Sequence, residues 1–162
     1  MILAAVTDLL DGYLARKLRV TSRFGSYADP MLDKVYYLVT LPTLLFLAHR
    51  TGDVEQARML LFLTVIFLLR DQWVSFLRSV GAVHGVSAKA NWSGKARTVV
   101  SFPTICVVYY YLQAPASLVQ IPTAVVHGLE IASTLINLIS IAVYTKAFLP
   151  ALRLELERPG EA

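Results

Sequence analysis

Four aspartates near the start of the chain constrain its fold more than any other feature. They form two pairs on either side of a basic turn: Asp8, Asp11, Asp29 and Asp33. Residues three or four apart share one face of a helix, so each pair presents both carboxylates together. An intramembrane carboxylate is costly unless it is paired or bound to a cation, and hard divalent cations prefer carboxylate oxygens. For any one aspartate alone, a solvated acid at a helix end is the simpler interpretation, but the four together predict a metal site.

The composition places these aspartates in a membrane protein. The chain has 162 residues, of which 56% are hydrophobic and 16% are charged, whereas a soluble domain usually carries about 25% charged residues. We therefore predict an all-α fold, a polytopic transmembrane helix bundle over residues 1–152 with a polar tail at 153–162. Cys106 is the only cysteine, so no intrachain disulfide forms.

Five hydrophobic spans are visible. They lie at residues 1–18, 24–48, 58–83, 98–114 and within 121–149, with polar connections between them. The basic connections at 16–23 and 78–97 predict the cytoplasmic side, by the positive-inside rule. The seven residues before Asp8 are too few to cross a hydrocarbon layer of roughly 30 Å.

The sequence around the aspartates resembles the signature of the CDP-alcohol phosphatidyltransferase family. It reads Asp8-x2-Asp11-Gly12-x2-Ala15-Arg16, then eight residues, then Gly25-x3-Asp29-x3-Asp33. All eight fixed positions are present at the family's spacing. The resemblance implies six membrane helices, so we expect the first helix and half of the second to be absent here.

The resemblance also implies a reaction and its residues. Family members transfer a phosphatidyl group from CDP-diacylglycerol to an alcohol and release CMP. The metal ligands would be the four aspartates, holding two Mg²⁺ or Mn²⁺ ions, with Asp33 as the general base. The CDP-binding residues would be Asp8, Gly12, Ala15, Arg16 and Gly25.

A second group of polar residues lies on the same predicted membrane side. Its basic members and one threonine would form a site for the phosphate of the acceptor: Arg70, Arg78, Lys95, Arg97 and Thr98. The alternative is ordinary loop charge together with one buried pair between Arg70 and Asp71. The spacing resembles the phosphatidylglycerophosphate synthase branch of the family. Arg97 replaces the usual lysine there, and Phe76 replaces the usual small residue.

The predicted function is therefore transfer of the phosphatidyl group to glycerol 3-phosphate in phospholipid biosynthesis. The alternatives are a relative of the cardiolipin synthase type, a relative with another acceptor, an inactive membrane fragment, and an ion or proton transporter. The expected partners are CDP-diacylglycerol, a small phosphorylated alcohol and membrane lipid, with no nucleic acid. Family members are commonly homodimers. We expect a bacterial inner (plasma) membrane protein with its active site on the cytoplasmic side.

Overall fold

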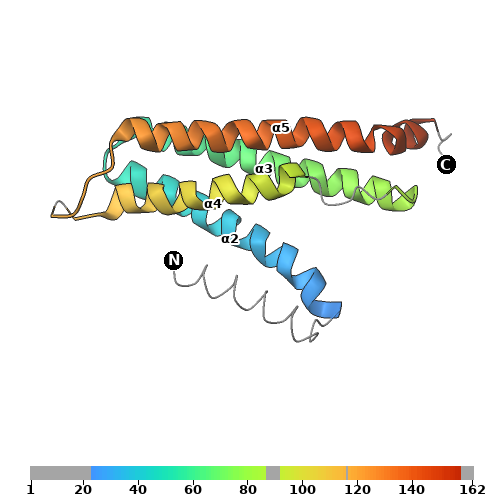
Figure 1. The fold of residues 1–162 in the computed structure, drawn as a ribbon, viewed down its shortest axis with the longest axis horizontal. Helices are drawn as coiled ribbons and strands as arrows, with labels where there is room; N and C mark the ends of the chain where they lie inside the picture. Colours follow the sequence, from blue (N-terminus) through green and yellow to red (C-terminus); the bar gives the residue numbers. More distant parts are fainter. Residues whose placement is uncertain (1–22, 87–91, 116, 158–162) are drawn as a thin grey trace.

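The fold is a bundle of long helices. The computed structural model describes residues 23–86, 92–115 and 117–157, with the side chains of 23–30 and of Asp33 left out of the description. Within these ranges every regular element is a helix: α2 (Arg23–Arg50), α3 (Val54–Val83), α4 (Trp92–Gln113) and α5 (Thr123–Leu156). Helix α5 packs along both α3 and α4, and these three helices run in nearly the same direction while α2 crosses them obliquely (Figure 1). The predicted all-α bundle is confirmed.

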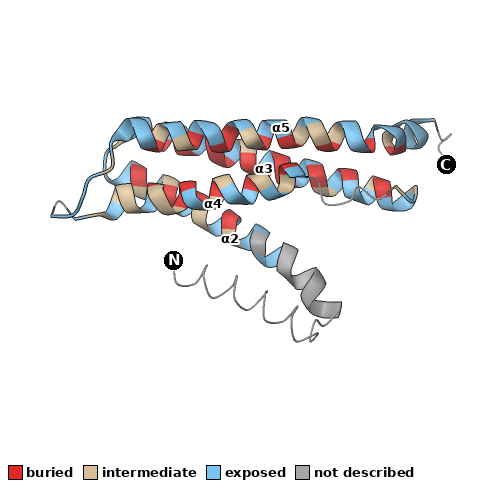
Figure 2. Cartoon of the chain, viewed as in Figure 1, coloured by how far each residue is buried: buried red, intermediate tan, exposed pale blue. Residues whose placement is uncertain are grey.

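Helix α5 has its small and polar residues inside and its large aliphatic residues outside. Its buried positions recur every three or four residues and include Ser133, Asn137 and Ser140, whereas Leu135 and Ile139 are exposed. Buried positions lie on the facing sides of the helices (Figure 2). Small and polar side chains at helix contacts with apolar side chains outside are typical of helices surrounded by lipid. The pattern therefore supports a membrane bundle.

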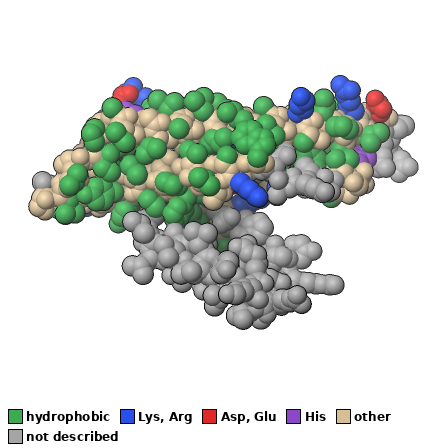
Figure 3. Space-filling view, viewed as in Figure 1, with side chains coloured by type: hydrophobic (Ala, Val, Ile, Leu, Met, Phe, Trp, Pro, Cys, Tyr) green, Lys and Arg blue, Asp and Glu red, His purple; other side chains and the backbone are tan. Residues whose placement is uncertain are grey.

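The outer surface agrees with this interpretation. Hydrophobic side chains cover most of the described part of the face in Figure 3, and charged side chains lie mainly toward its two ends. Two helices, α3 and α5, are long and apolar enough to cross a membrane by length and composition. The membrane character of the chain is thus supported, and the number of five spans stays a prediction.

The boundary between α2 and α3 differs from the prediction. A polar connection was expected at 49–58, but α2 continues to Arg50 and α3 already begins at Val54. Asp53 explains the early start, because its carboxylate accepts a hydrogen bond of 3.0 Å from the backbone N–H of Gln56 and thereby caps the helix. Gly52, with φ +80°, makes the tight turn before this cap.

Two further boundaries differ in the second half of the chain. The polar connection expected between the spans 58–83 and 98–114 is shorter, because α4 begins at Trp92 and already includes Lys95 and Arg97. Helix α5 ends at Leu156, inside the segment predicted as a polar tail. The residues from Arg153 to Glu157 are nevertheless all exposed. The domain division at residue 152 stays a prediction.

Candidate active site

The motif of the four aspartates falls mostly outside the described residues. This applies to five of the predicted site residues: Asp8, Asp11, Gly12, Ala15 and Arg16. The backbone of the other three motif positions, Gly25, Asp29 and Asp33, belongs to α2. The helical placement expected for residues 25–33 is therefore confirmed, and the roles of the aspartates stay predictions.

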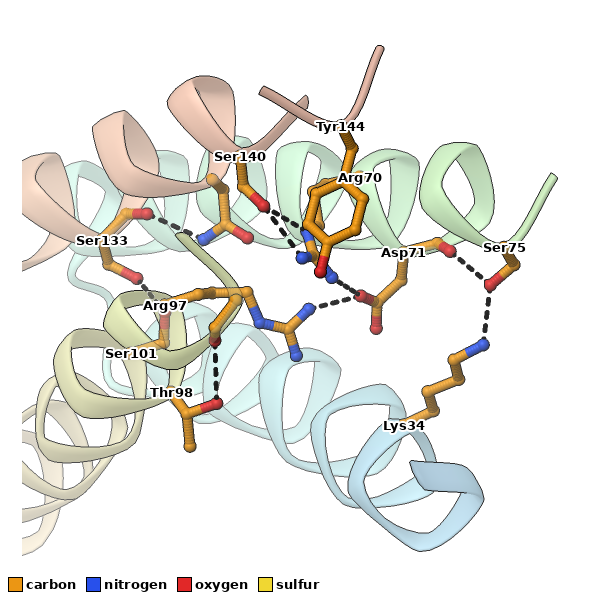
Figure 4. Close-up of polar contacts among 12 residues, drawn as sticks. Lys34, Arg70, Asp71, Ser75, Arg97, Thr98, Ser101, Ser133, Ser140 and Tyr144 are labelled. Atoms are coloured by element: carbon orange, nitrogen blue, oxygen red, sulfur yellow. Dashed lines mark hydrogen bonds and ion pairs between the residues drawn. The ribbon is translucent and has the colours of Figure 1, made fainter. Parts of the chain in front are cut away.

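A buried ionic group of α3 and α4 lies in the middle of the bundle. We call Arg70, Asp71, Arg97 and Ser140 the arginine cluster. Arg70 donates one hydrogen bond of 2.9 Å from Nη1 to Oδ1 of Asp71, and Arg97 donates to the same oxygen. Arg70 also donates from Nε and Nη2 to the hydroxyl of Ser140, at 3.1 and 2.8 Å. Figure 4 shows the two guanidiniums converging on Asp71 from different helices. The buried pair of Arg70 and Asp71, which was part of the alternative interpretation of these residues, is present.

The arginine cluster is shielded from solvent and carries excess positive charge. Arg70, Asp71 and Arg97 are 6%, 7% and 7% exposed. Burying charges is costly unless they are paired and hydrogen-bonded, and one carboxylate here serves two guanidiniums. Arg97 is further enclosed by aromatic rings, with its Cζ atom 4.4 Å from the ring centre of Phe67 and 5.3 Å from that of Tyr37. The excess charge makes the cluster a suitable neighbour for an anion.

The three other residues predicted for the acceptor site are not members of the cluster. Arg78, Lys95 and Thr98 are all exposed. Arg78 joins the cluster indirectly, since its Nη2 atom donates a hydrogen bond of 3.2 Å to the hydroxyl of Tyr144. The hydroxyl of Thr98 donates to the Gly94 carbonyl at 3.4 Å. The structure thus brings Arg70 and Arg97 together around Asp71 and leaves the other three more accessible.

Phe76 does not point toward this group of residues. It is 49% exposed, and its ring lies 5.6 Å from that of Trp73. The indole N–H of Trp73 in turn donates to the hydroxyl of Thr145 on α5 at 2.8 Å. Phe76 therefore lies on the outer side of α3.

Helix α2 contacts α3 beside the arginine cluster. Lys34, the residue after Asp33, donates a hydrogen bond of 2.7 Å to the hydroxyl of Ser75. That hydroxyl donates in turn to the backbone carbonyl of Asp71, also at 2.7 Å. One turn along α2, Tyr37 faces the guanidinium of Arg97. The segment of α2 that follows Asp33 is thus in direct contact with the cluster (Figure 4).

The sequence interpretation missed the contribution of α5. Ser140 binds Arg70, and Tyr144 faces both Arg70 and Arg78. The available signal was a polar stripe in an otherwise apolar helix, at intervals of four, three and four residues: Ser133, Asn137, Ser140 and Tyr144. Ser133 also bonds to a neighbouring helix, because its hydroxyl and that of Ser101 on α4 share a hydrogen bond of 2.8 Å. Such a stripe in a membrane helix indicates a polar interior.

A second buried polar group lies toward the other end of α3. We call Gln56, His127 and Glu130 the glutamate cluster. The side-chain amide of Gln56 donates to Oε1 of Glu130 at 2.6 Å, and its oxygen lies 3.1 Å from Nε2 of His127. Gln56 and Glu130 are 0% and 1% exposed, and Oε2 of Glu130 is buried with no hydrogen-bond partner among the described residues. This cluster joins α3 to α5.

Carboxylates of α2 are candidate ligands for a metal ion. In the part of the chain that the structure describes, no three His, Cys, Asp or Glu residues gather to hold a metal ion. The backbone of α2 is continuous through positions 29 and 33, and positions four residues apart lie on one face of a helix. A pair of carboxylates fits a hard divalent cation.

Comparison with known proteins adds independent information. The sequence model of the CDP-alcohol phosphatidyltransferase family matches residues 1–146. Curated relatives carry the name CDP-diacylglycerol–glycerol-3-phosphate 3-phosphatidyltransferase. The protein from Haemophilus influenzae is 37% identical over 98 residues, which are 59% of this chain and 49% of that protein. The Bacillus subtilis protein is 32% identical over 123 residues, 76% of this chain and 58% of that protein.

A third relative covers more of the chain. The protein of the same name from Pectobacterium atrosepticum is 28% identical over 132 residues, 82% of this chain and 64% of that protein. The chain thus spans about half to two thirds of the length of these relatives. No solved structure matches.

Proposed function

Because the chain belongs to the CDP-alcohol phosphatidyltransferase family, we propose that it transfers a phosphatidyl group from CDP-diacylglycerol to glycerol 3-phosphate. The products are CMP and phosphatidylglycerophosphate. The names of the curated relatives support this choice of acceptor, and the family supports the reaction class.

One structural observation carries the proposal. The helix that bears Asp29 and Asp33 contacts Arg97 of the arginine cluster through Tyr37, and its Lys34 bonds to Ser75 next to the cluster. The site of the diphosphate and the site of an anionic acceptor must be neighbours, because the acceptor hydroxyl has to reach the reacting phosphorus. A positively charged cluster beside the aspartate-bearing helix meets this requirement. Charge-assisted bonds from guanidinium groups suit the phosphate of the acceptor.

The residues of the chain have distinct parts in the proposed reaction. The oxygen of the acceptor hydroxyl attacks the phosphorus of the phosphatidyl group, and Asp33 accepts the proton that this hydroxyl loses. The bond between that phosphorus and the bridging diphosphate oxygen breaks, and CMP leaves with the electron pair. Proton transfer to a positioned base typically contributes about 10²–10⁴-fold to the rate. The arginine cluster, with Arg78, Lys95 and Thr98, binds and orients the acceptor phosphate.

The family generally uses a divalent metal, and the aspartates would hold it. Asp8, Asp11 and Asp29 would bind one ion, and Asp33 would also contact a second. Bound Mg²⁺ or Mn²⁺ supplies charge neutralisation on the diphosphate and stabilisation of the leaving group. Gly12, Ala15, Arg16 and Gly25 would surround the nucleotide, where small residues allow a close approach to the backbone.

The positive-inside rule supports a cytoplasmic active site. Three residues of the acceptor site lie on the predicted basic side of the membrane: Arg78, Lys95 and Arg97. The basic connection at 16–23 lies on the same side. We therefore propose a bacterial inner (plasma) membrane protein that meets its water-soluble acceptor from the cytoplasm. A homodimer stays an expectation from the family resemblance.

Substitution of Asp33 by Asn tests the proposed chemistry. We expect Asp33→Asn to abolish release of CMP from CDP-diacylglycerol while binding of the lipid nucleotide largely survives, because the amide cannot accept the proton. Asp53→Asn is the matched control. It makes the same change at the start of α3, where Asn caps a helix about as well as Asp.

The same assay separates the alternatives. Turnover of Asp33→Asn close to that of the unmodified chain would remove Asp33 from its role. A chain that binds CDP-diacylglycerol and releases no CMP with any acceptor would be an inactive fragment or a transporter. CMP release that requires phosphatidylglycerol instead of glycerol 3-phosphate would identify an enzyme of the cardiolipin synthase type.

A further inference from the structure

Tyr144 occupies a central place among the basic residues, although no motif includes it. It belongs to α5, lies 2% exposed, and packs with Val74, Leu77 and Phe148. Tyrosine that is buried normally directs its hydroxyl to a polar partner. Here the partner is a guanidinium of α3.

Two arginines of α3 share the ring of Tyr144. The Cζ atoms of Arg70 and Arg78 lie 5.4 and 5.5 Å from the ring centre. Both distances are within the range of cation–π attraction. The two arginines are eight residues apart, or about two helical turns, so one aromatic ring spans the distance between them.

The two arginines differ in how firmly they are held. Arg70 is buried and makes three further hydrogen bonds, to Asp71 and Ser140. Arg78 is exposed, and the one hydrogen bond that it makes within the described part of the chain is the 3.2 Å bond to the Tyr144 hydroxyl. Without that hydroxyl, Arg78 would lose its hydrogen-bonded anchor and gain rotamer freedom, which a bound anion would have to remove again.

The hydroxyl of Tyr144 also touches the start of α4. A Cβ atom added to Gly94 would lie 3.2 Å from this oxygen, closer than an ordinary contact. The absence of a side chain at Gly94 therefore lets the tyrosine reach the first turn of α4, next to Lys95. Tyr144 thus lies where the predicted phosphate-binding residues of α3 and α4 come together.

We infer that Tyr144 is a positioning residue for the acceptor phosphate, acting through Arg78. It holds the exposed Arg78 guanidinium in a fixed position through the hydroxyl and the ring, and it thereby sets the affinity for a phosphorylated alcohol. The inference rests on the proposed function, because it assigns the anion to the acceptor substrate.

The test is Tyr144→Phe, which keeps the ring and removes the hydroxyl. We expect the KM for glycerol 3-phosphate to rise about tenfold, the usual effect of losing a hydrogen bond to a charged group. The KM for CDP-diacylglycerol and kcat should stay unchanged. Tyr109→Phe is the matched control, because Tyr109 is an exposed tyrosine of α4 and should leave all three parameters unchanged.

Two further variants test whether Tyr144 acts through Arg78. The double variant Tyr144→Phe with Arg78→Ala should be no worse than Arg78→Ala alone, since the hydroxyl has no second route to the anion. Gly94→Ala should raise the KM for glycerol 3-phosphate in the unmodified background, where its Cβ presses on the hydroxyl. It should have little effect in the Tyr144→Phe background.

Direct binding of radiolabelled glycerol 3-phosphate separates this inference from the proposed function. If the unmodified chain releases no CMP but Tyr144→Phe weakens this binding about tenfold, the proposed reaction fails and the positioning role stands. If the chain is active and Tyr144→Phe retains the normal KM, the positioning role fails. An equal rise in both KM values, or additive effects with Arg78→Ala, would also overturn it.

Discussion

The arginine cluster and the glutamate cluster are both buried at the contact of α3 with α5, yet their chemistry differs. In the arginine cluster the guanidiniums of Arg70 and Arg97 both pair with the one carboxylate of Asp71, so the cluster has excess positive charge. In the glutamate cluster one carboxyl group meets an amide, and one of its oxygens has no hydrogen-bond partner among the described residues. The first group has two guanidiniums for one carboxylate and can attract an anion, whereas the second contains no arginine or lysine.

Their surroundings also differ. The arginine cluster contacts α2 through Tyr37, four residues after Asp33, and the exposed Arg78 is linked to it through Tyr144. The glutamate cluster lies near the turn between α2 and α3, where Asp53 caps α3 and accepts a 3.4 Å hydrogen bond from Tyr111. Buried polarity is thus not by itself a sign of a site. The excess charge and the neighbouring motif distinguish the arginine cluster, so the glutamate cluster should matter for stability alone.

The largest expected effect is that of Asp71→Ala. Removing this carboxylate leaves the Arg70 and Arg97 guanidiniums buried without their counter-charge, and breaking a buried ion pair in this way typically costs about 3–5 kcal/mol. We expect the free energy of unfolding in detergent to fall by this amount and the activity to fall with it. A change below about 1 kcal/mol would contradict the pairing, since exposed ion pairs have effects of that size.

Glu130→Ala should have an intermediate effect. The buried amide of Gln56 loses its acceptor, which costs about 1–3 kcal/mol. The KM values and kcat should remain unchanged where the protein is folded. Glu130→Gln is the control, because its amide oxygen can still accept the Gln56 hydrogen bond. A rise in the KM for glycerol 3-phosphate in Glu130→Ala would contradict the contrast between the two clusters.

Arg78→Ala and Lys95→Ala should change the kinetics and leave the stability unchanged, which is the reverse of the effect expected for Glu130→Ala. Both residues are exposed, so the free energy of unfolding should change little. Loss of one charge-assisted contact should raise the KM for glycerol 3-phosphate about tenfold. Steady-state kinetics with the acceptor varied would measure this effect. An unchanged KM in both variants would count against the anion site.

Lys34→Met should have the smallest effect. The bond between Lys34 and Ser75 is exposed, and such contacts typically contribute no more than about 1 kcal/mol. We expect a small loss of stability and a modest loss of kcat, because α2 is held less firmly beside α3. Thermal unfolding would measure the loss of stability, and CMP release from the same preparation would measure the loss of kcat.

The sequence predicted the helical class, the buried Arg70–Asp71 pair and the basic character of the site. It did so because an intramembrane charge is rare and demands a partner. It did not predict that Arg97 joins the same carboxylate, since this requires the start of α4 to lie beside α3. The roles of Tyr144 and Ser140 were missed for a related reason, because each residue alone is an ordinary member of an apolar helix. The start of α3 lies earlier than the hydrophobic pattern indicates, because Asp53 caps a first turn that is itself polar.

The most direct test of the central claim is a competition among acceptors. The purified full chain would receive CDP-diacylglycerol and Mg²⁺ with equal concentrations of glycerol 3-phosphate, phosphatidylglycerol and inositol phosphate, and the lipid products would be resolved by mass. We predict phosphatidylglycerophosphate as the main product, with one CMP released for each lipid formed. Cardiolipin or another product without phosphatidylglycerophosphate, or no CMP release at all, would contradict the account.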